Sequence, residues 1–548
     1  MAARFLVLCF LLLALPGCMV VDTGPDRPFL VDRVTPPQRL NNRSPWYNLN
    51  GEQVHLYANY CGWDPQENER VVHTQIGDKV IDMVKSADEL IVGTFFLFDN
   101  LYAYEPAGDY VDELADMLIA KKREIPSIRI VLMLDLIHKG WAHRRSKVVD
   151  RLVAAGVDVF YSDLLETRSA QRLGIWEGLN EIGRQGDLAT DGVLAVPWNL
   201  AGLIPLPFVL DDEVTTVATA MNASLFKANH RKALVVKHQG VYEALITSWN
   251  PHNPSLLHEN HAISVTGPLA CYMYEMLRED VRKSLALERD YVQVPENASD
   301  YLQRKLPALP ESSWKVSDTA ATASSTEPQA AIATEEAIEP ILMQWLANVQ
   351  PDDRVRIQMF YLSRVPVVNA ILDAAARTRY PIRLLLDPNR TGINYAKDGT
   401  PNAQVAAYLL ERARLENVGI EIRWYSTHGE QNHAKAFTIT NEKTGKYLMS
   451  LGSANWTRKN LGGINLEDNI FIRNSAELNR HFNAFFDDLW FNEEDGIEYS
   501  VAWDDPVHNY NRSTGRDFWA IPRRDALLAP RFDAKGRPEL LEQELVHW

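Results

Sequence analysis

The sequence contains an internal duplication, and this feature limits the folds that the chain can adopt more than any other. Two stretches repeat one order of elements: an apolar strand, a helix, a second strand, another helix and a third strand. The predicted strands are residues 89–98, 128–135 and 157–161 in the first copy, and 354–362, 382–387 and 420–425 in the second. Alternating strands and helices build an α/β layer, because each crossover helix covers one face of the sheet. We therefore expect two similar α/β sandwich halves, each a mostly parallel mixed sheet flanked by helices.

Composition indicates where the two copies begin and end. Residues 318–337 are rich in Ala, Ser, Thr, Glu and Pro and lack periodicity, which predicts a solvated linker. The predicted organisation is a signal peptide at 1–18, an N-terminal extension at 19–70, a first half at 71–310, a linker at 311–337, a second half at 338–497 and a C-terminal extension at 498–548.

The first half carries an insertion near residues 163–228 that has no counterpart in the second half. Its apolar run at 196–210 contains three prolines, which makes a helix unfavourable there. The insertion is interpreted as an elaboration that packs on its own domain. A lid, or an apolar surface that touches lipid, is the alternative.

The N-terminus is typical of an export signal. Arg4 precedes an apolar run at 5–15, which is too short to span a bilayer but suits a secretory signal. Leu15-Pro16-Gly17-Cys18 then resembles the bacterial lipobox, which predicts lipidation of Cys18; a plain secretory signal is the alternative. Lipid would anchor an exported protein to the cell envelope. Because Met19, and not Asp, follows the cysteine, the outer membrane is the expected location.

Charge and cysteine content exclude some classes of protein. The chain has 56 Lys and Arg against 72 Asp and Glu, a net charge of −16, which disfavours duplex nucleic acid as a partner. Four cysteines in 548 residues are too few for a disulfide scaffold. Outside the signal only Cys61 and Cys271 remain, either as a pair or as two separate thiols. Nothing in the sequence requires an oligomer, and a monomer is compatible with it.

Each copy closes with the same local pattern. The motifs are Asn229-His230-Arg231-Lys232 and Asn432-His433-Ala434-Lys435, each followed by an apolar run. Because residues i and i+2 of a strand share a face, the His and the Lys of each motif point the same way. A second element follows each motif: Thr247-Ser248-Trp249-Asn250 in the first copy and Gly452-Ser453-Ala454-Asn455 in the second.

These residue types suit the chemistry of a phosphodiester. The anion repels a nucleophile, and Lys232 and Lys435 would counter its charge while Asn250 and Asn455 supply neutral donors. An imidazole is nucleophilic when neutral and acidic when protonated, both near neutral pH. The histidines lack acidic neighbours at metal-ligand spacing, so neither a metal nor a cofactor is expected.

The duplicated His-x-Lys motif, with Gly/Thr-Ser-x-Asn after each copy, resembles the phospholipase D superfamily over roughly residues 70–497. The resemblance implies one active site made by both halves at their interface. It also implies that His230 forms a phosphohistidine and that His433 is the acid and base. Lys232 and Lys435 would complete the catalytic set, with Asn250, Asn455, Ser248 and Ser453 in contact with substrate.

Two further parts of the family pattern can be compared with this sequence, and the first of them is missing. The family has an Asp beyond each His-x-Lys, where this chain has Lys237 and Thr440. The family also carries Asn-x-Glu further on, which Asn465-Leu466-Glu467 matches. Glu467 would orient a histidine across the interface. In the first half Glu259 is the candidate, although Asn260 and His261 fit the register as well.

Three functions follow as hypotheses. The first is a membrane-anchored phosphodiesterase that hydrolyses phospholipid headgroups or transfers them, with phospholipid as substrate. The second is a nuclease of the same superfamily, for which a short single-stranded end would need few cations. The third is a non-catalytic envelope protein that binds phosphate or lipid, which the two missing Asp residues motivate.

Overall fold

The computed structural model describes residues 43–49, 54–100, 109–135, 147–162, 205–210, 213–216, 228–285, 298–315, 326–389, 391–392, 395–396, 399, 401–505, 531–532 and 538–539. The predicted signal peptide, the lipidation site Cys18, most of the insertion and most of the C-terminal extension lie outside these residues. The two halves belong to one compact unit, residues 42–548.

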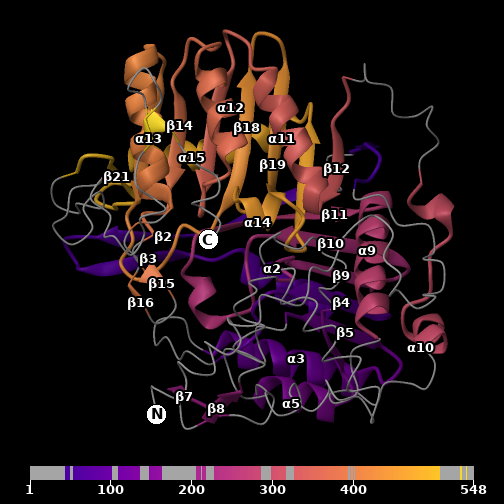
Figure 1. Ribbon diagram of the computed structural model, residues 1–548. Helices are drawn as coiled ribbons and strands as arrows, with labels where there is room; N and C mark the ends of the chain where they lie inside the picture. The colour runs from indigo at the N-terminus through magenta and orange to yellow at the C-terminus, as the bar shows by residue number, and fades with distance from the viewer. Residues whose placement is uncertain are drawn as a thin grey trace, which may run out of the picture. The chain divides into compact units, whose positions relative to one another are not determined.

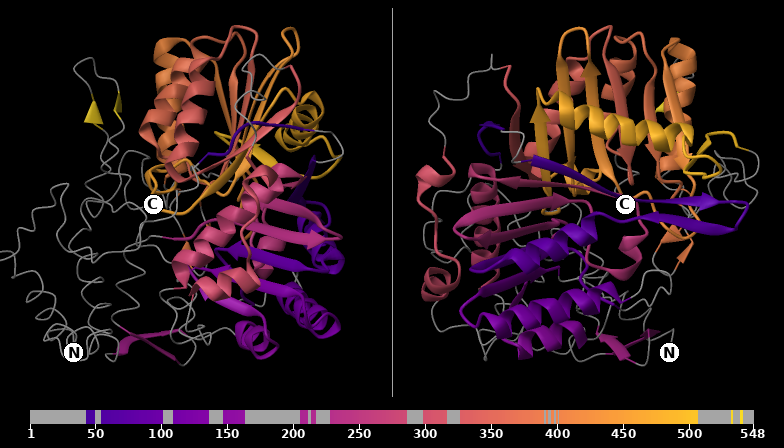
Figure 2. Two further views of the ribbon diagram at one scale, coloured as in Figure 1. Left: turned by 90° about the vertical axis from the view of Figure 1, so that its right-hand side faces the viewer. Right: turned by 180° about the vertical axis from the view of Figure 1, so that it is seen from behind.

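The first half is built on an eight-stranded sheet (Figure 1). Its strands, in spatial order, are β3 (Glu69–His73), β2 (Val54–Asp64), β11 (Asn260–Thr266), β10 (Val241–Thr247), β9 (Ala233–His238), β4 (Leu90–Phe95), β5 (Arg129–Leu134) and β6 (Asp158–Tyr161). Apolar residues of α2 (Ile76–Ser86), α3 (Tyr110–Glu124) and α5 (Lys147–Ala154) share one core with the strands. Helix α9 (Pro268–Ser284) covers the opposite face, and α10 (Ala298–Lys305) follows it (Figure 2).

The second half is built on a nine-stranded sheet. Its strands are β1 (Tyr47–Asn48), β12 (Gln329–Thr334), β20 (Asp468–Arg473), β19 (Lys446–Gly452), β18 (Lys435–Asn441), β13 (Arg354–Met359), β14 (Ile382–Leu386), β17 (Ile420–Tyr425) and β21 (Ser500–Ala502). Helices α11 (Ile338–Ala347), α12 (Val365–Ala375) and α13 (Asn402–Glu416) pack on one face, and α15 (Ala476–Phe491) crosses the other (Figures 1 and 2). The short helix α14 (Arg458–Leu461) lies between β19 and β20 in the chain.

The two sheets repeat one strand order, which confirms the α/β duplication that the sequence predicts. From β2 the first sheet runs β2-β11-β10-β9-β4-β5-β6, and from β12 the second runs β12-β20-β19-β18-β13-β14-β17. The corresponding motifs therefore occupy the same place in each half.

The prediction of mostly parallel sheets is wrong. Only β4, β5 and β6, and their counterparts β13, β14 and β17, run parallel; the other neighbours in both sheets are antiparallel. Crossover helices enforce parallel pairing only between the first strands of each copy. The first two strands after each His-x-Lys motif, β9 with β10 and β18 with β19, are joined by short turns, which reverse the chain.

The copies begin earlier in the chain than the predicted boundaries place them. Strand β2 lies in the predicted N-terminal extension, and β12 lies in the predicted linker, yet each pairs with its own sheet. The composition of β12, Gln-Ala-Ala-Ile-Ala-Thr, is that of a linker, but all of its residues are buried between β1 and β20. Strand β21, in the predicted C-terminal extension, pairs with β17.

The insertion near 163–228 contributes a two-stranded antiparallel sheet to the described residues, β7 (Pro205–Leu210) and β8 (Glu213–Thr216). Whether it packs as an elaboration or as a lid concerns residues outside the described ranges. Cys61, which is buried, and Cys271 are both free thiols. Across the part of the chain that the structure describes, no helix combines the length and apolar character needed to cross a bilayer.

Candidate active site

The two His-x-Lys motifs lie where the chain enters matching strands. Residues 229–232 run directly into β9, and Lys435 is the first residue of β18. Buried apolar residues such as Val235 and Phe437 hold these strands in their sheets. Each His and Lys is therefore presented from the end of a rigid strand, at the same place in each half.

Two short backbone pairings join the halves beside the histidines. They are Asn229 with Leu466 and Glu259 with Asn432, both parallel. The His230 N–H donates to the Leu466 carbonyl at 2.8 Å, and the His433 N–H donates to the Glu259 carbonyl at 2.9 Å. Each motif is thus attached to a segment of the opposite half, which brings both histidines to one interface.

His230 is held by a carboxylate from the second half. Its Nδ1 lies 3.0 Å from Oε2 of Glu467, which is fully buried. The Ser453 hydroxyl donates to the same oxygen at 2.5 Å, and the Asn460 amide donates to the other oxygen. Because an ionised carboxylate only accepts, Nδ1 of His230 carries the proton and Nε2 is left free.

His433 is held by an amide from the first half. Its Nδ1 lies 3.0 Å from Oδ1 of Asn260, to which the Ser248 hydroxyl donates at 2.9 Å. The Asn260 amide nitrogen donates to the His258 carbonyl at 3.0 Å, which leaves Oδ1 as the acceptor for His433. The Nε2 of His433 is therefore the free nitrogen here too.

The strand register identifies Asn260 as the counterpart of Glu467. Thr247 lies opposite Ala262 in the first sheet, and Gly452 lies opposite Asn469 in the second, so the residues two positions earlier correspond. The side chain of Glu259, the predicted candidate, instead lies 3.0 Å from His261, and only its backbone holds His433. The two serines, predicted to contact substrate, donate to these positioning side chains.

The two lysines are buried and arranged alike. Lys232 Nζ donates to the His230 carbonyl at 2.7 Å, and Lys435 Nζ to the His433 carbonyl at 2.5 Å. Lys232 lies 5.3 Å from the ring centre of Phe96, and Lys435 lies 5.0 Å from that of Phe360. Each phenylalanine ring also packs on the histidine of its own half, with ring centres 5.0 and 4.8 Å apart. Such contacts between ammonium and ring faces favour the cation.

The charges of the four residues act on one another. Burial lowers the pKa of His230 to about 4, although Glu467 opposes this shift. Burial, followed by Lys435 and Lys232, holds the pKa of His433 well below its usual value. Burial lowers the pKa of Lys232 to about 8, and burial together with Lys232 lowers that of Lys435. A cluster of buried cationic groups is electrostatically prepared for an anion, which would relieve this repulsion.

Two aspartates that the sequence analysis did not single out support the motifs. Asp135 accepts from the backbone N–H of Asn229 at 2.5 Å, and Asp387 accepts from that of Asn432 at 2.8 Å. Burial raises the pKa of Asp387 to about 7. Both follow the second strand of their copy, so comparing the copies could have found them, and the same comparison pairs Phe96 with Phe360.

The two predicted substrate-binding asparagines are both buried. The side-chain oxygen of Asn250 accepts from the Leu97 N–H at 3.1 Å, which fixes the turn after β4. The side-chain oxygen of Asn455 has no hydrogen-bond partner among the described residues. Asn250 therefore has a structural contact that Asn455 does not share.

The positions of the missing motif aspartates are occupied by paired residues. Lys237 forms an ion pair with Glu89 at 2.5 Å. The Thr440 hydroxyl donates to Asn479 at 2.6 Å and accepts from Asn483 at 2.8 Å, on α15. Neither position is an unfilled gap, because both side chains tie their strand to a neighbouring element.

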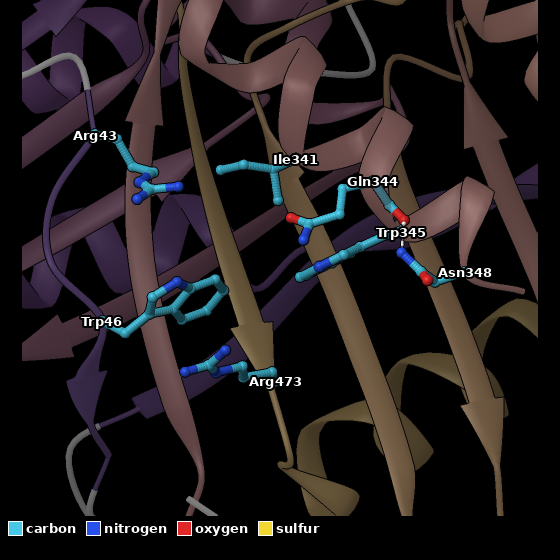
Figure 3. Close-up of a pocket in the computed structure, with 7 residues that line it drawn as sticks. All are labelled: Arg43, Trp46, Ile341, Gln344, Trp345, Asn348 and Arg473. Carbon is cyan, nitrogen blue, oxygen red and sulfur yellow. Dashed lines mark hydrogen bonds between the residues drawn. The ribbon is translucent and has the colours of Figure 1, made fainter. Parts of the chain in front are cut away.

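Two further features bear on ligands. Within the described ranges, no group of three or more His, Cys, Asp and Glu side chains is arranged to hold a metal ion. A cavity of about 330 Å³ lies beside α11, where the guanidinium of Arg473 is 4.3 Å from the ring centre of Trp46 (Figure 3). It shares no lining residue with the histidine site.

Residues 343–490 match the protein family described as "Cardiolipin synthase, PLD-like domain". No curated protein matches the sequence. Among solved structures, phosphatidylserine synthase from Haemophilus influenzae Rd KW20 is 11% identical, with a TM-score of 0.50, over 84% of this chain and 90% of that one.

Two other solved structures match with lower scores. Polyphosphate kinase from Porphyromonas gingivalis is 12% identical, with a TM-score of 0.39, over 83% of this chain and 53% of that one. The phospholipase D family member Nuc from Salmonella typhimurium is 16% identical, with a TM-score of 0.25, over 33% of this chain and 100% of that one.

The family match covers the second half, and the phosphatidylserine synthase shares the fold over most of the chain. The matching strand order extends the same architecture to the first half. The second half is therefore similar to the phospholipase D-like family, and the chain shares its fold with the phosphatidylserine synthase across both halves.

Proposed function

We propose that the protein is a phosphodiesterase of the phospholipase D type that hydrolyses phospholipid headgroups or transfers them to an acceptor alcohol. One observation carries the proposal. His230 and His433, one from each half, are each held at Nδ1 by the opposite half, so both Nε2 atoms are free beside two buried lysines. Phospholipid as substrate is supported by the names of the matched family and of the phosphatidylserine synthase.

His230 is the proposed nucleophile. The bound phosphodiester anion offsets the charge of the two lysines, so that His433 takes up a proton at Nε2. The Nε2 lone pair of His230 attacks phosphorus, the bond from phosphorus to the leaving alcohol breaks, and the Nε2 proton of His433 passes to the leaving oxygen. Glu467 stabilises the positive charge that develops on the His230 ring. Lys232 and Lys435 counter the charge on the phosphoryl oxygens, for which the Asn455 side chain is a further donor.

The second step returns the enzyme to its starting state. Neutral His433 takes a proton from water or from an acceptor alcohol, whose oxygen attacks phosphorus. The bond from phosphorus to Nε2 breaks, and its electron pair returns to His230. Water gives hydrolysis and an alcohol gives transfer, so the same site accommodates both outcomes.

Attachment to the membrane is the second part of the proposal. The lipobox-like sequence at 15–18 supports lipidation of Cys18 and a location in the cell envelope, and Met19 after it supports the outer membrane. Metabolic labelling with a fatty acid, lost in Cys18→Ser, tests this part independently of catalysis. Unchanged labelling in the variant would refute it.

Defined liposomes test the catalytic part. The full chain is incubated with vesicles of phosphatidylcholine, phosphatidylethanolamine or phosphatidylglycerol, and headgroup release or transfer to added glycerol is measured. His230→Ala should abolish turnover, whereas His238→Ala, at a half-exposed histidine paired with Asp88, should not. A labelled oligonucleotide is added in parallel.

The outcomes separate the three hypotheses. Turnover of a phospholipid that depends on His230 supports the proposal. Cleavage of the oligonucleotide alone would establish the nuclease instead. Vesicle binding with no turnover of any substrate and no phosphoryl adduct would favour the non-catalytic envelope protein.

A further inference from the structure

The residue between His230 and Lys232 is a fully buried arginine. Arg231 is 2% exposed, whereas the matching position of the second half holds Ala434. A buried guanidinium is costly unless carboxylates surround it. Here Asp280 on α9 accepts from Nη1, and Glu335, in the turn after β12, accepts from Nη2 at 2.5 Å. One carboxylate comes from each half.

The same pair contacts both sides of Glu467, the residue that holds His230. The Glu467 backbone N–H donates to Oε1 of Glu335 at 3.1 Å. The Glu467 carbonyl accepts from Nε of Arg231 at 3.3 Å. The backbone N–H of Glu467 is therefore bound by Glu335 and its carbonyl by Arg231, and these two side chains also bind each other.

The strand register explains why Glu467 requires such partners. The last ladder pair between β12 and β20 is Thr334 with Asp468, so Glu467 lies one residue beyond the ladder. Its counterpart Asn260 is the terminal residue of a ladder and pairs with Asn59 of β2. Side chains thus replace strand pairing at Glu467, while ordinary pairing fixes Asn260.

The backbone of Glu335 indicates that its placement is constrained. Its φ is +47°, in the left-handed region that residues other than glycine rarely adopt. Strain of this kind persists where the surroundings determine it, and it gathers at functional sites. The turn directs the Glu335 carboxylate to Arg231 and Glu467 immediately after β12 ends.

We propose that Arg231 and Glu335 are positioning residues that clamp the backbone of Glu467, so that its carboxylate meets Nδ1 of His230. The clamp exists only at the histidine whose partner is a carboxylate; at His433, Ala434 stands at the position of Arg231 and Asn260 at that of Glu467. The inference rests on the proposed function for its effect on catalysis, but the geometry that it concerns can be tested without turnover.

The first readout is the pKa of His230, followed by NMR of the full chain labelled with ¹³C-histidine. His230 is faced by Glu467, which raises its pKa, and by Lys232 and Lys435, which lower it. Glu335→Ala and Arg231→Ala should each lower the pKa of His230 as Glu467→Gln does, and leave that of His433 unchanged. Glu335→Gln keeps an acceptor for the Glu467 N–H and should retain most of the wild-type value.

The matched control is Arg356→Ala. Arg356 is also buried and also paired with a carboxylate, Asp487, at 3.0 and 2.6 Å, but it does not contact Glu467. It should reduce stability without moving the pKa of His230. If Arg231→Ala does not fold, the two Glu335 variants still decide the question.

The second readout is kcat with bis(p-nitrophenyl) phosphate. Glu335→Ala should lower kcat about 10-fold to 100-fold, the usual effect of losing a residue that orients a catalytic group. In a Glu467→Gln background the same change should have little further effect, because Glu335 acts through Glu467.

The clamp would be overturned if Glu467→Gln shifted the pKa of His230 and Glu335→Ala left it unchanged. Fully additive losses of kcat would overturn it as well. An inactive wild-type chain would refute the proposed function, while the titration would still report on the clamp.

Discussion

Glu467 holds His230, whereas Asn260, at the matching position of the other half, holds His433. Both partners fix the same tautomer and leave Nε2 free, so the two halves present their histidines alike. They differ in what happens when the ring becomes charged. A carboxylate stabilises an imidazolium, and an amide oxygen does so much less. Under the proposed mechanism, this difference favours His230, whose partner is a carboxylate, as the nucleophile.

The halves differ again at the matching positions of Gly452 and Thr247. A Cβ at Gly452 would lie only 2.2 Å from the Asp468 carbonyl, so the second half has no room for a side chain there. The first half has Thr247, whose hydroxyl donates to the His261 carbonyl at 2.8 Å. His261 is the counterpart of Asp468, so the first half replaces a close approach of two backbones with a hydrogen bond. Duplicated scaffolds can thus support one site with different local contacts.

The largest expected effect separates the two histidines by leaving group. His230→Ala should lower kcat about 10⁴-fold or more with any substrate, because the nucleophile is lost. His433→Ala should cost about 10²-fold or more with an alkyl leaving group, but little for the first step with p-nitrophenolate, which needs no proton. Acid-labile adduct mapping by mass spectrometry checks the assignment. A phosphoryl adduct on His433 would contradict the assignment. So would a loss of kcat in His433→Ala that is equal with the alkyl and the p-nitrophenolate leaving groups.

The second prediction removes the carboxylate. Glu467→Gln should lower kcat about 10-fold to 100-fold. Since Glu467 raises the pKa of His230, its loss lowers that pKa further. Neutral His230 is required for attack, so the acid limb of kcat/KM, expected near pH 4 in the wild type, should move to lower pH. Glu442→Gln, at an exposed glutamate paired with Arg480, is the control and should leave the profile in place. An acid limb that keeps its wild-type pH or moves to higher pH would contradict the proposed effect of Glu467 on His230.

The third prediction adds a carboxylate to the other half. Asn260→Asp should raise the pKa of His433, which makes it a weaker acid. Because His433 must be protonated to assist the leaving group, the alkaline limb of kcat/KM should move to higher pH. The plateau rate with an alkyl leaving group should fall about several-fold, as expected from Brønsted behaviour. A pH profile on folded protein measures this, and an alkaline limb that does not move would show that Asn260 does not govern His433.

The smallest effects concern the two positions without the family aspartate. Thr440→Val removes two buried hydrogen bonds, one to Asn479 and one from Asn483, which should cost about 1–3 kcal/mol of unfolding free energy. Lys237→Ala removes only a partly exposed ion pair and should cost less than about 1 kcal/mol. Neither variant should change kcat. Denaturant unfolding measures both, and a loss of kcat without a loss of stability would show that these positions act on the site directly.

Comparison of the copies predicted much of the site. The duplicated His-x-Lys motifs indicated one interface, and the structure brings His230 and His433 to it. The pattern Asn465-Leu466-Glu467 indicated a carboxylate that reaches across, and Glu467 contacts His230. The same comparison could also have identified Asp135 with Asp387, and Phe96 with Phe360. The strand β12 was not, because its sequence carries only the composition of a linker and its burial comes from the strands on either side.

The sequence by itself determined the α/β duplication and the two His-x-Lys motifs, because both depend on residue types at local spacing. Only the tertiary structure decided that Asn260 and not Glu259 holds His433, since a shift of one residue in strand register moves a side chain to the other face. The clamp of Arg231 and Glu335 on Glu467 is likewise decided by the tertiary structure alone. It joins residues far apart in the chain, and their contact depends on where a strand ladder ends.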